Sequence, residues 1–200
     1  MNLPGVYDTF NKLWDGYQTV WITSDCHFNE EDLKAGFPNR PSDDELVKRI
    51  NAKVGSRDVL LILGDCGDLE YVKKLRGYKV LVAGNHDCGL TKYKEIFDEV
   101  YEGAVFIGEK LLLSHEPVPA SWYTNLHGHD HAGAKRKGRI NCCLDVNDYW
   151  PINMNQLLKS GIYKDVESIH RITIDNATAR ARKRGKKYGS YSVNSRSTIA

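Results

Sequence analysis

Three short apolar runs, rich in β-branched residues, divide the first half of the chain. They cover residues 19–23, 58–63 and 78–83, and each stops close to a glycine or an acidic residue. Runs of this length bounded by turn residues are typical of buried strands. Apolar positions at helical spacing over 68–76 separate the second run from the third. This strand–helix–strand alternation predicts parallel neighbouring strands.

A second helix is predicted just before the 58–63 run. Ser42 and Glu45 form a capping box, and Leu46, Ile50 and Val54 then recur at helical spacing as a stripe to be buried. A shorter helix is expected over 91–97. Both helices would cover a face of the predicted sheet.

The pattern changes after residue 100. Segments 104–107 and 110–113 flank Gly108 and Glu109, which predicts a hairpin. Further strands are expected over 123–126, 139–145 and 169–174, with a helix over 152–158. A parallel half followed by a hairpin-rich half indicates an α/β protein of two facing sheets with helices outside.

Composition bounds the class of protein. The chain has 200 residues, 41% hydrophobic and 27% charged, which is typical of one globular domain. We expect no secretory signal and no membrane segment, because no basic start precedes an apolar block and no apolar run approaches about 20 residues. Five cysteines, an odd number, favour reduced thiols and a cytoplasmic location.

Acidic, histidine and asparagine side chains gather in five segments, three of which directly follow the apolar runs. These segments are Asp25–His27, Gly64–Asp68, Gly84–Asp87, Ser114–His115 and Gly128–His131. Because parallel strands deliver the residues past their carboxyl ends to one crevice, we expect the segments to converge. If Asp and His were only turn residues at strand ends, this would explain one such segment but not five.

The converging side chains have the chemistry of metal ligands: Asp25, His27, Asp65, Asn85, His115, His129 and His131. Carboxylate, imidazole and amide donors without thiolate favour manganese, with iron, zinc, nickel and cobalt also compatible. Seven ligands exceed the needs of one four-coordinate ion. They suit two ions about 3.5–4 Å apart that share a carboxylate, each ion facing one of its oxygens.

The five segments, in this order, resemble the signature of the calcineurin-like metallophosphoesterase superfamily over residues 20–131. The resemblance implies a four-layer α/β/β/α sandwich of two mixed sheets flanked by helices. It also implies that one metal is held by Asp25, His27, Asp65 and His131. The other would be held by Asp65, Asn85, His115 and His129, so that Asp65 bridges the pair.

The same resemblance implies roles around the metals. A metal-bound hydroxide would attack phosphorus in line with the leaving oxygen, and His86 would stabilise the transition state or protonate that oxygen. Asp68 or Asp87 would orient His86. Asn85 is also a candidate substrate contact. Arg40 is a candidate phosphate clamp, an interpretation we weigh evenly against a surface arginine in a proline turn.

The end of the chain differs in charge. Residues 176–200 hold seven of the 28 basic residues and no acidic one, which leaves 21 basic against 26 acidic residues, a net charge of −5, in residues 1–175. We therefore predict a phosphoesterase domain over 1–175 and a basic tail over 176–200. The tail fits a solvated extension, which we favour, or a grip on nucleic-acid phosphates.

Three functions stay open from the sequence. The first is a metal-dependent hydrolase of a small, nucleotide-like phosphodiester or phosphomonoester. The second is an enzyme on nucleic-acid backbones or ends, held to its substrate by the basic tail. The third is a protein-interaction scaffold of the same fold, against which the intact ligand set argues. The sequence leaves the oligomeric state open.

Overall fold

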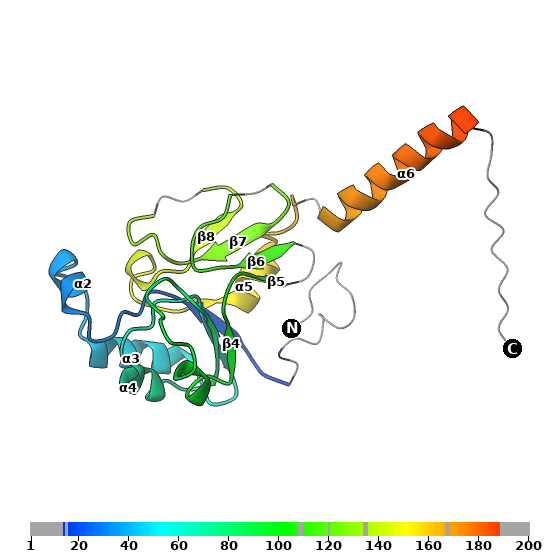
Figure 1. Ribbon diagram of the computed structural model, residues 1–200. Helices are drawn as coiled ribbons and strands as arrows, with labels where there is room; N and C mark the ends of the chain where they lie inside the picture. The colour runs from blue at the N-terminus through cyan, green and yellow to red at the C-terminus, as the bar shows by residue number, and fades with distance from the viewer. Residues whose placement is uncertain are drawn as a thin grey trace, which may run out of the picture.

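Two mixed β-sheets with flanking helices form the body of the protein in this computed structural model (Figure 1). The structure describes residues 14, 16–107, 110–119, 121–133, 136–166 and 169–188, with backbone alone for Lys34, 169–172 and 185–188. Within these residues the predicted α/β class and the two facing mixed sheets are confirmed.

The first sheet has the strand order β4-β3-β2-β1-β9. Strands β1 to β4 pair in parallel, and β9 pairs antiparallel with β1 at the edge. The parallel arrangement predicted from the first half of the chain is therefore confirmed. The strands are β1 (Val20–Thr23), β2 (Val59–Ile62), β3 (Tyr78–Val82), β4 (Glu99–Tyr101) and β9 (Ile152–Asn153).

The second sheet has the order β5-β6-β7-β8, formed by Val105–Ile107, Leu111–Leu113, Thr124–His127 and Arg139–Asn141. Strands β5 and β6 pair antiparallel, as the hairpin pattern predicts, although residues 108 and 109 lie outside the described ones. Strands β6, β7 and β8 are parallel. A hairpin-rich second half is therefore wrong beyond its first pair, because long connections return the chain to the end of the sheet at which the preceding strand began.

Strand β2 is apolar throughout because both of its faces are buried. Leu61 and Leu63 belong to the buried cluster between the two sheets, whereas Leu60 and Ile62 belong to the cluster that includes the helices. A strand covered on both faces needs apolar side chains on both. Each fully buried leucine or isoleucine contributes about 2 kcal/mol, so β2 anchors both layers.

The helices are α2 (Glu31–Gly36), α3 (Asp43–Lys53), α4 (Leu69–Lys73), α5 (Met154–Ser160) and α6 (Ile169–Tyr188), with 3₁₀ turns η1 (Tyr93–Glu95) and η2 (Leu144–Val146). Ser42 caps α3 as the capping box predicts, accepting a hydrogen bond from the Glu45 N–H. Leu46 and Ile50 of α3 pack on the first sheet. None of the described helices is long and apolar enough to cross a membrane.

Four predicted elements differ in the structure. The helix expected over 91–97 is only the 3₁₀ turn η1. Residues 142–145 leave β8 and turn into η2, and residues 152–153 form β9 before α5 begins. The strand predicted over 169–174 is wrong, because this segment is the start of α6. Ile172 and Ile174 alternate with a polar residue only once, which is too short to separate strand from helix. Helix α6 projects from the body and crosses the boundary predicted at residue 175 (Figure 1).

Candidate metal centre

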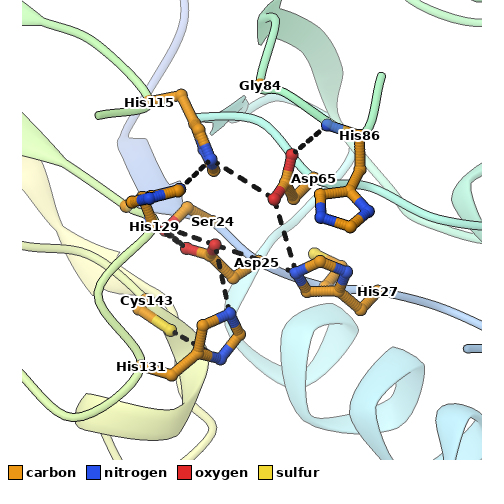
Figure 2. Close-up of polar contacts among 12 residues, drawn as sticks. Ser24, Asp25, His27, Asp65, Gly84, His86, His115, His129, His131 and Cys143 are labelled. Atoms are coloured by element: carbon orange, nitrogen blue, oxygen red, sulfur yellow. Dashed lines mark hydrogen bonds and ion pairs between the residues drawn. The ribbon is translucent and has the colours of Figure 1, made fainter. Parts of the chain in front are cut away.

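The five predicted segments meet at the carboxyl ends of the strands, and their side chains point toward one another (Figure 2). Asp25 and His27 follow β1, Asp65 follows β2, and His86 follows β3. The second sheet supplies His115 after β6, and His129 and His131 after β7. The two sheets thus contribute to one site, as the convergence argument predicts.

Asp65 lies at the centre of the group. Its Oδ2 is 3.5 Å from Nε2 of His27 and 3.3 Å from Nε2 of His115. Its Oδ1 instead accepts a hydrogen bond of 3.0 Å from the His86 N–H. One oxygen of Asp65 is thus engaged by the backbone, and the other faces both histidines.

One ligand group surrounds Asp25. Donor atoms of Asp25, His27 and Asp65 all lie within 4.8 Å of one another. Nε2 of His131 is 3.5 Å from Oδ1 of Asp25. Nε2 of His27 is buried and has no hydrogen-bond partner among the residues that the structure describes. A buried nitrogen of this kind, facing two carboxylates, has the chemistry of a cation ligand.

The other ligand group lies on the opposite side of Asp65. Donor atoms of Asp65, His115 and His129 lie within 4.8 Å of one another. Nε2 of His115 is 2.8 Å from Oδ1 of Asn85 and 3.1 Å from Nδ1 of His129. The seven predicted ligands thus form two groups that share Asp65, and this donor set fits two divalent ions.

Charge in the site is coupled through Asp65 and His115. Burial opposes ionisation of Asp65, but its hydrogen bonds to His115 and to the His86 N–H hold its pKa below the usual range. Burial also disfavours the His115 imidazolium, yet the bond to Asp65 raises the pKa of His115 to about 8. A cation bound here would displace that proton, since a ligating imidazole is neutral.

Four of the predicted ligands have left-handed backbone: φ is 57° at Asp25, 42° at His27, 54° at Asp65 and 68° at His129. This region is uncommon for residues other than glycine, although Asp, Asn and His tolerate it best. Backbone of this kind persists where the surrounding structure enforces it, and it clusters at functional sites. The strand ends therefore hold these side chains in place before any ligand binds.

Two glycines make room for the carboxylates. A Cβ at Gly84 would overlap Oδ1 of Asp65, and a Cβ at Gly128 would overlap Oδ2 of Asp25. The backbone of Gly84 is not left-handed. Its role is close approach: the Asp65 carboxylate occupies the space that a side chain would fill.

Two carboxylates that the sequence analysis missed orient histidines. Oε2 of Glu30 lies 2.8 Å from Nδ1 of His27, and Oδ2 of Asp145 lies 2.7 Å from Nδ1 of His131. A carboxylate on Nδ1 fixes the proton there and leaves Nε2 free as a ligand. The three-residue spacing of Glu30 from His27 offered a signal. Asp145 offered none, because its position depends on η2.

Arg40 does not lie where a phosphate clamp must lie. Its side chain is 1% exposed and forms a two-oxygen ion pair with Asp145 at 2.5 Å. The same guanidinium donates to the backbone carbonyls of Asp25 and Cys26. Both interpretations of Arg40, substrate clamp and surface arginine, are therefore wrong, because the guanidinium is buried against the backbone that carries the predicted ligands Asp25 and His27.

His86 lies at the open side of the site, with a side chain 54% exposed and a ring nearly perpendicular to that of His27 (Figure 2). Asp87 accepts hydrogen bonds from the N–H groups of Asp65, Cys66 and Gly84. Asp87, one of the two carboxylates predicted to orient His86, thus binds backbone groups instead.

Asp68 caps α4 through the Glu70 N–H and accepts a bond from Asn29. The described carboxylate that lies nearest the His86 ring belongs to Glu30, whose Oε2 is 4.0 Å from Nδ1. The orientation of His86 by Asp68 or Asp87 is therefore not what this geometry supports.

A family model for calcineurin-like phosphoesterases matches residues 18–190. The chain belongs to the calcineurin-like phosphoesterase family. Among solved structures it is similar to AQ665 of Aquifex aeolicus, described as a protein of unknown function, with 27% identity and a TM-score of 0.58. That match covers 70% of this chain and 98% of AQ665. No curated protein matches the chain.

Membership in the calcineurin-like phosphoesterase family implies metal-dependent hydrolysis of phosphoesters, and clusters of candidate metal ligands are present. The match extends past the end of α6. AQ665 brings no activity to this chain, because its description gives none.

Proposed function

We propose that the protein hydrolyses small, nucleotide-like phosphoesters at a dinuclear metal centre. The observation that carries the proposal is the position of Asp65 Oδ2, which lies within 3.5 Å of histidines from both ligand groups. One ion would be held by Asp25, His27, Asp65 and His131. The other would be held by Asp65, Asn85, His115 and His129.

Manganese is the metal we propose, because carboxylate, amide and imidazole donors are mixed without a thiolate ligand. A pair of such ions supplies Lewis-acid polarisation of phosphoryl oxygens and lowers the pKa of a water molecule. The protein would hold the ligand side chains in place and place Asp65 between the two ions. It leaves the side of the site next to His86 open to substrate.

His86 is the group we assign to the leaving oxygen. Its backbone N–H is fixed on Asp65 Oδ1, while its ring extends to the exposed rim of the site. A histidine in this position can donate a proton to the departing alkoxide or phenoxide. Glu30, 4.0 Å away, is the carboxylate we assign to its orientation.

Asn85 has a double role in this proposal. Its Oδ1 faces His115 and His129, both within 3.1 Å. The amide nitrogen is then directed away from these histidines and can donate a hydrogen bond to a phosphoryl oxygen. Asn85 would therefore contact both metal and substrate, without help from the buried Arg40.

The test is a phosphoester panel with protein loaded separately with Mn²⁺, Ni²⁺ or Zn²⁺. Bis-p-nitrophenyl phosphate and p-nitrophenyl phosphate separate diester from monoester preference, and elemental analysis gives the metal content. We expect two metal equivalents and hydrolysis with Mn²⁺. Protein that binds metal in no condition and hydrolyses no ester would leave the interaction scaffold as the function.

A second candidate function is action on nucleic acid, favoured by helix α6. Its described side chains from residue 173 to 184 are all exposed, and four of them are cations: Arg180, Arg182, Lys183 and Arg184. No ion pair reaches these four among the residues that the structure describes. Cations near a helix C-terminus are also favourable to the helix itself, so exposure alone does not require a partner.

Changing the four α6 cations to glutamine tests this candidate. If α6 grips phosphates, binding to single-stranded DNA weakens and its salt dependence becomes shallower, by about 0.9 in log–log slope for each lost contact to duplex and less for single strands. Unchanged binding refutes it and leaves the solvated extension. Tyr191 and Arg196, also in the predicted tail, lie outside the described residues.

Five free cysteines, four of them buried, fit a reducing compartment. We therefore include a cytoplasmic location in the proposal. Staining of the tagged protein in fractionated cells tests it directly.

A further inference from the structure

The Arg40 guanidinium connects three pieces of chain that carry metal ligands. It donates to the carbonyl of Asp25 at 2.8 Å and to that of Cys26 at 2.6 Å, next to His27. It also binds both oxygens of Asp145, whose Oδ2 in turn lies 2.7 Å from Nδ1 of His131. Among the described residues, the hydrogen bonds of the Arg40 guanidinium thus all lead to the ligand group around Asp25.

A contribution to folding stability does not explain the buried ion pair between Arg40 and Asp145. Arg40 and Asp145 side chains are 1% and 2% exposed. A buried ion pair gains little over an apolar pair of similar volume, because both charges lose their hydration. A charged pair retained at this depth therefore calls for another role, and the geometry supplies one: only a planar fork can reach two carbonyls and a carboxylate together.

The segment around Arg40 makes a second contact with the same histidine. The ring of Phe37 packs on the ring of His131 with centroids 5.4 Å apart. His131 is therefore held by Asp145 at Nδ1 and by Phe37 on its face, and its Nε2 is aimed at Oδ1 of Asp25, 3.5 Å away (Figure 2).

The other ligand group has separate support. Nδ1 of His115 lies 2.8 Å from the Leu63 carbonyl, and Asp87 holds the backbone of Asp65 and Gly84 together. Arg40 and Asp145 contact none of these groups among the described residues. Asp25 also accepts hydrogen bonds from the His129 N–H, which joins the two groups at the backbone. The groups that orient the ligand rings nevertheless differ, with Asp145 on His131 and the Leu63 carbonyl on His115.

We infer that Arg40 and Asp145 are positioning residues that set the metal affinity of the half of the centre formed by Asp25, His27 and His131, and not of the half formed by Asn85, His115 and His129. The inference rests on the proposed dinuclear centre. It assigns Arg40 to assembly of the site rather than to substrate, and it predicts that one ion is lost before the other.

The experiment compares the full-length wild-type protein with Arg40→Lys and Asp145→Asn. Lysine keeps the charge but reaches one acceptor at a time. Asparagine keeps the shape of Asp145 but removes its charge, and it serves as the second variant if Arg40→Lys folds poorly. Each protein is stripped of metal and titrated with Mn²⁺ by calorimetry. Electron paramagnetic resonance then distinguishes a spin-coupled Mn²⁺ pair from an isolated ion.

We expect the wild type to bind two equivalents and to show the spin-coupled pair. In both variants one equivalent should bind about 10–100-fold more weakly, the usual effect of removing a partner behind a metal ligand. The other equivalent should keep its affinity, and the spectrum at low Mn²⁺ should become that of an isolated ion. Circular dichroism and thermal unfolding of the metal-free proteins check that each variant is folded.

Arg49→Lys is the matched control. Arg49 pairs with Glu45 and the Asp148 carbonyl and packs over Trp150, so it is a bound arginine without a link to the ligands. It should bind two equivalents as the wild type does.

Two outcomes overturn the inference. Folded variants that bind both ions with wild-type affinity show that the pair does not position ligands. Variants that weaken both equivalents alike show that it supports the fold and not one half of the centre. A wild type that binds no metal contradicts the proposed function itself, which keeps the two failures apart.

Discussion

Oε2 of Glu30 lies 2.8 Å from Nδ1 of His27, and this contact leaves Nε2 of the ring facing Asp25 and Asp65. The same carboxylate is 4.0 Å from the His86 ring. Glu30 therefore stands between a predicted ligand and the predicted proton donor, which gives it two separable effects.

Replacement of Glu30 by glutamine should show both effects. We expect Mn²⁺ affinity at one equivalent to fall by about 10-fold because His27 loses a charged partner. At saturating Mn²⁺, kcat should stay reduced while KM changes little, since His86 also loses its nearest carboxylate. Calorimetry and steady-state kinetics measure the two effects. Glu31→Gln, one residue further on, is the control, and equal kinetics for both variants would remove Glu30 from the site.

Asp65→Asn should remove the carboxylate that we propose the two ions share. The amide offers one neutral oxygen in place of the Oδ2 that faces His27 and His115, so at most one ion should remain after dialysis. Hydrolysis of bis-p-nitrophenyl phosphate should fall on the order of 10³-fold, as when a preorganised electrostatic group is lost. Elemental analysis and kinetics test this. An Asp65→Asn protein with two ions and normal activity would falsify the shared-carboxylate assignment.

His86→Ala should slow catalysis without loss of metal. General acid catalysis contributes about 10²–10⁴-fold, and its loss matters most for leaving groups that need a proton. We therefore expect a smaller decrease for p-nitrophenyl esters than for alkyl esters. Rates across a leaving-group series, together with metal content, provide the measurement. Loss of an ion in this variant would show that His86 is a ligand.

Gly84→Ala should weaken metal binding through a steric clash, without removing a ligand. The added methyl group overlaps Oδ1 of Asp65 and must displace the carboxylate or the strand end. We expect weaker metal binding and a loss of about 1–3 kcal/mol of folding free energy, the usual cost of overpacking. Gly103→Ala is the control, because nothing lies within 4 Å of a Cβ there. Chemical unfolding of both variants gives the comparison.

Tyr78 and Tyr101, which lie near Glu99, should make folding stability depend on pH in the alkaline range. Burial and the nearby Glu99 carboxylate raise the pKa of Tyr78 and of Tyr101 to about 12. The folded state thus favours the neutral phenols more than the unfolded chain does, where their pKa is about 10. This contribution to stability is complete below pH 10 and is lost as pH rises toward 12.

Absorbance titration of tyrosine, with unfolding measured at pH 9 and at pH 11, tests this expectation. Glu99→Gln should lower the pKa of both tyrosines and flatten the decrease in stability. It also leaves Trp14 with a neutral acceptor, since the Trp14 ring N–H donates to Glu99. A variant with the wild-type alkaline profile would contradict the role of Glu99.

Sequence patterns predicted the features that depend on neighbours along the chain. The apolar run at β2 and the acid that follows it, Asp65, are visible because strand and ligand are adjacent. The pairing of His131 with Asp145 was not predictable, because it depends on the 3₁₀ turn η2, which the hydrophobic pattern of residues 139–145 does not indicate. Arg40 was misassigned for a related reason: its charge suggested solvent and substrate, whereas long-range packing buries it.

The same limit explains the second half of the fold. Segments 104–107 and 110–113 form a local hairpin, which two adjacent runs and a short turn make evident. The parallel pairing of β6 with β7, and of β7 with β8, joins strands across connections of ten or more residues. Hydrophobic patterning gives the existence of such strands but not their direction.

The left-handed backbone at Asp25 and Asp65 decides how the site is best probed. An alanine at either position would add about 1–2 kcal/mol of conformational penalty to the loss of the carboxylate, and the two effects would appear as one. Asparagine accepts the same backbone geometry, so it isolates the chemical contribution. A routine alanine scan would therefore exaggerate the importance of these carboxylates, and the amide series is the fair comparison.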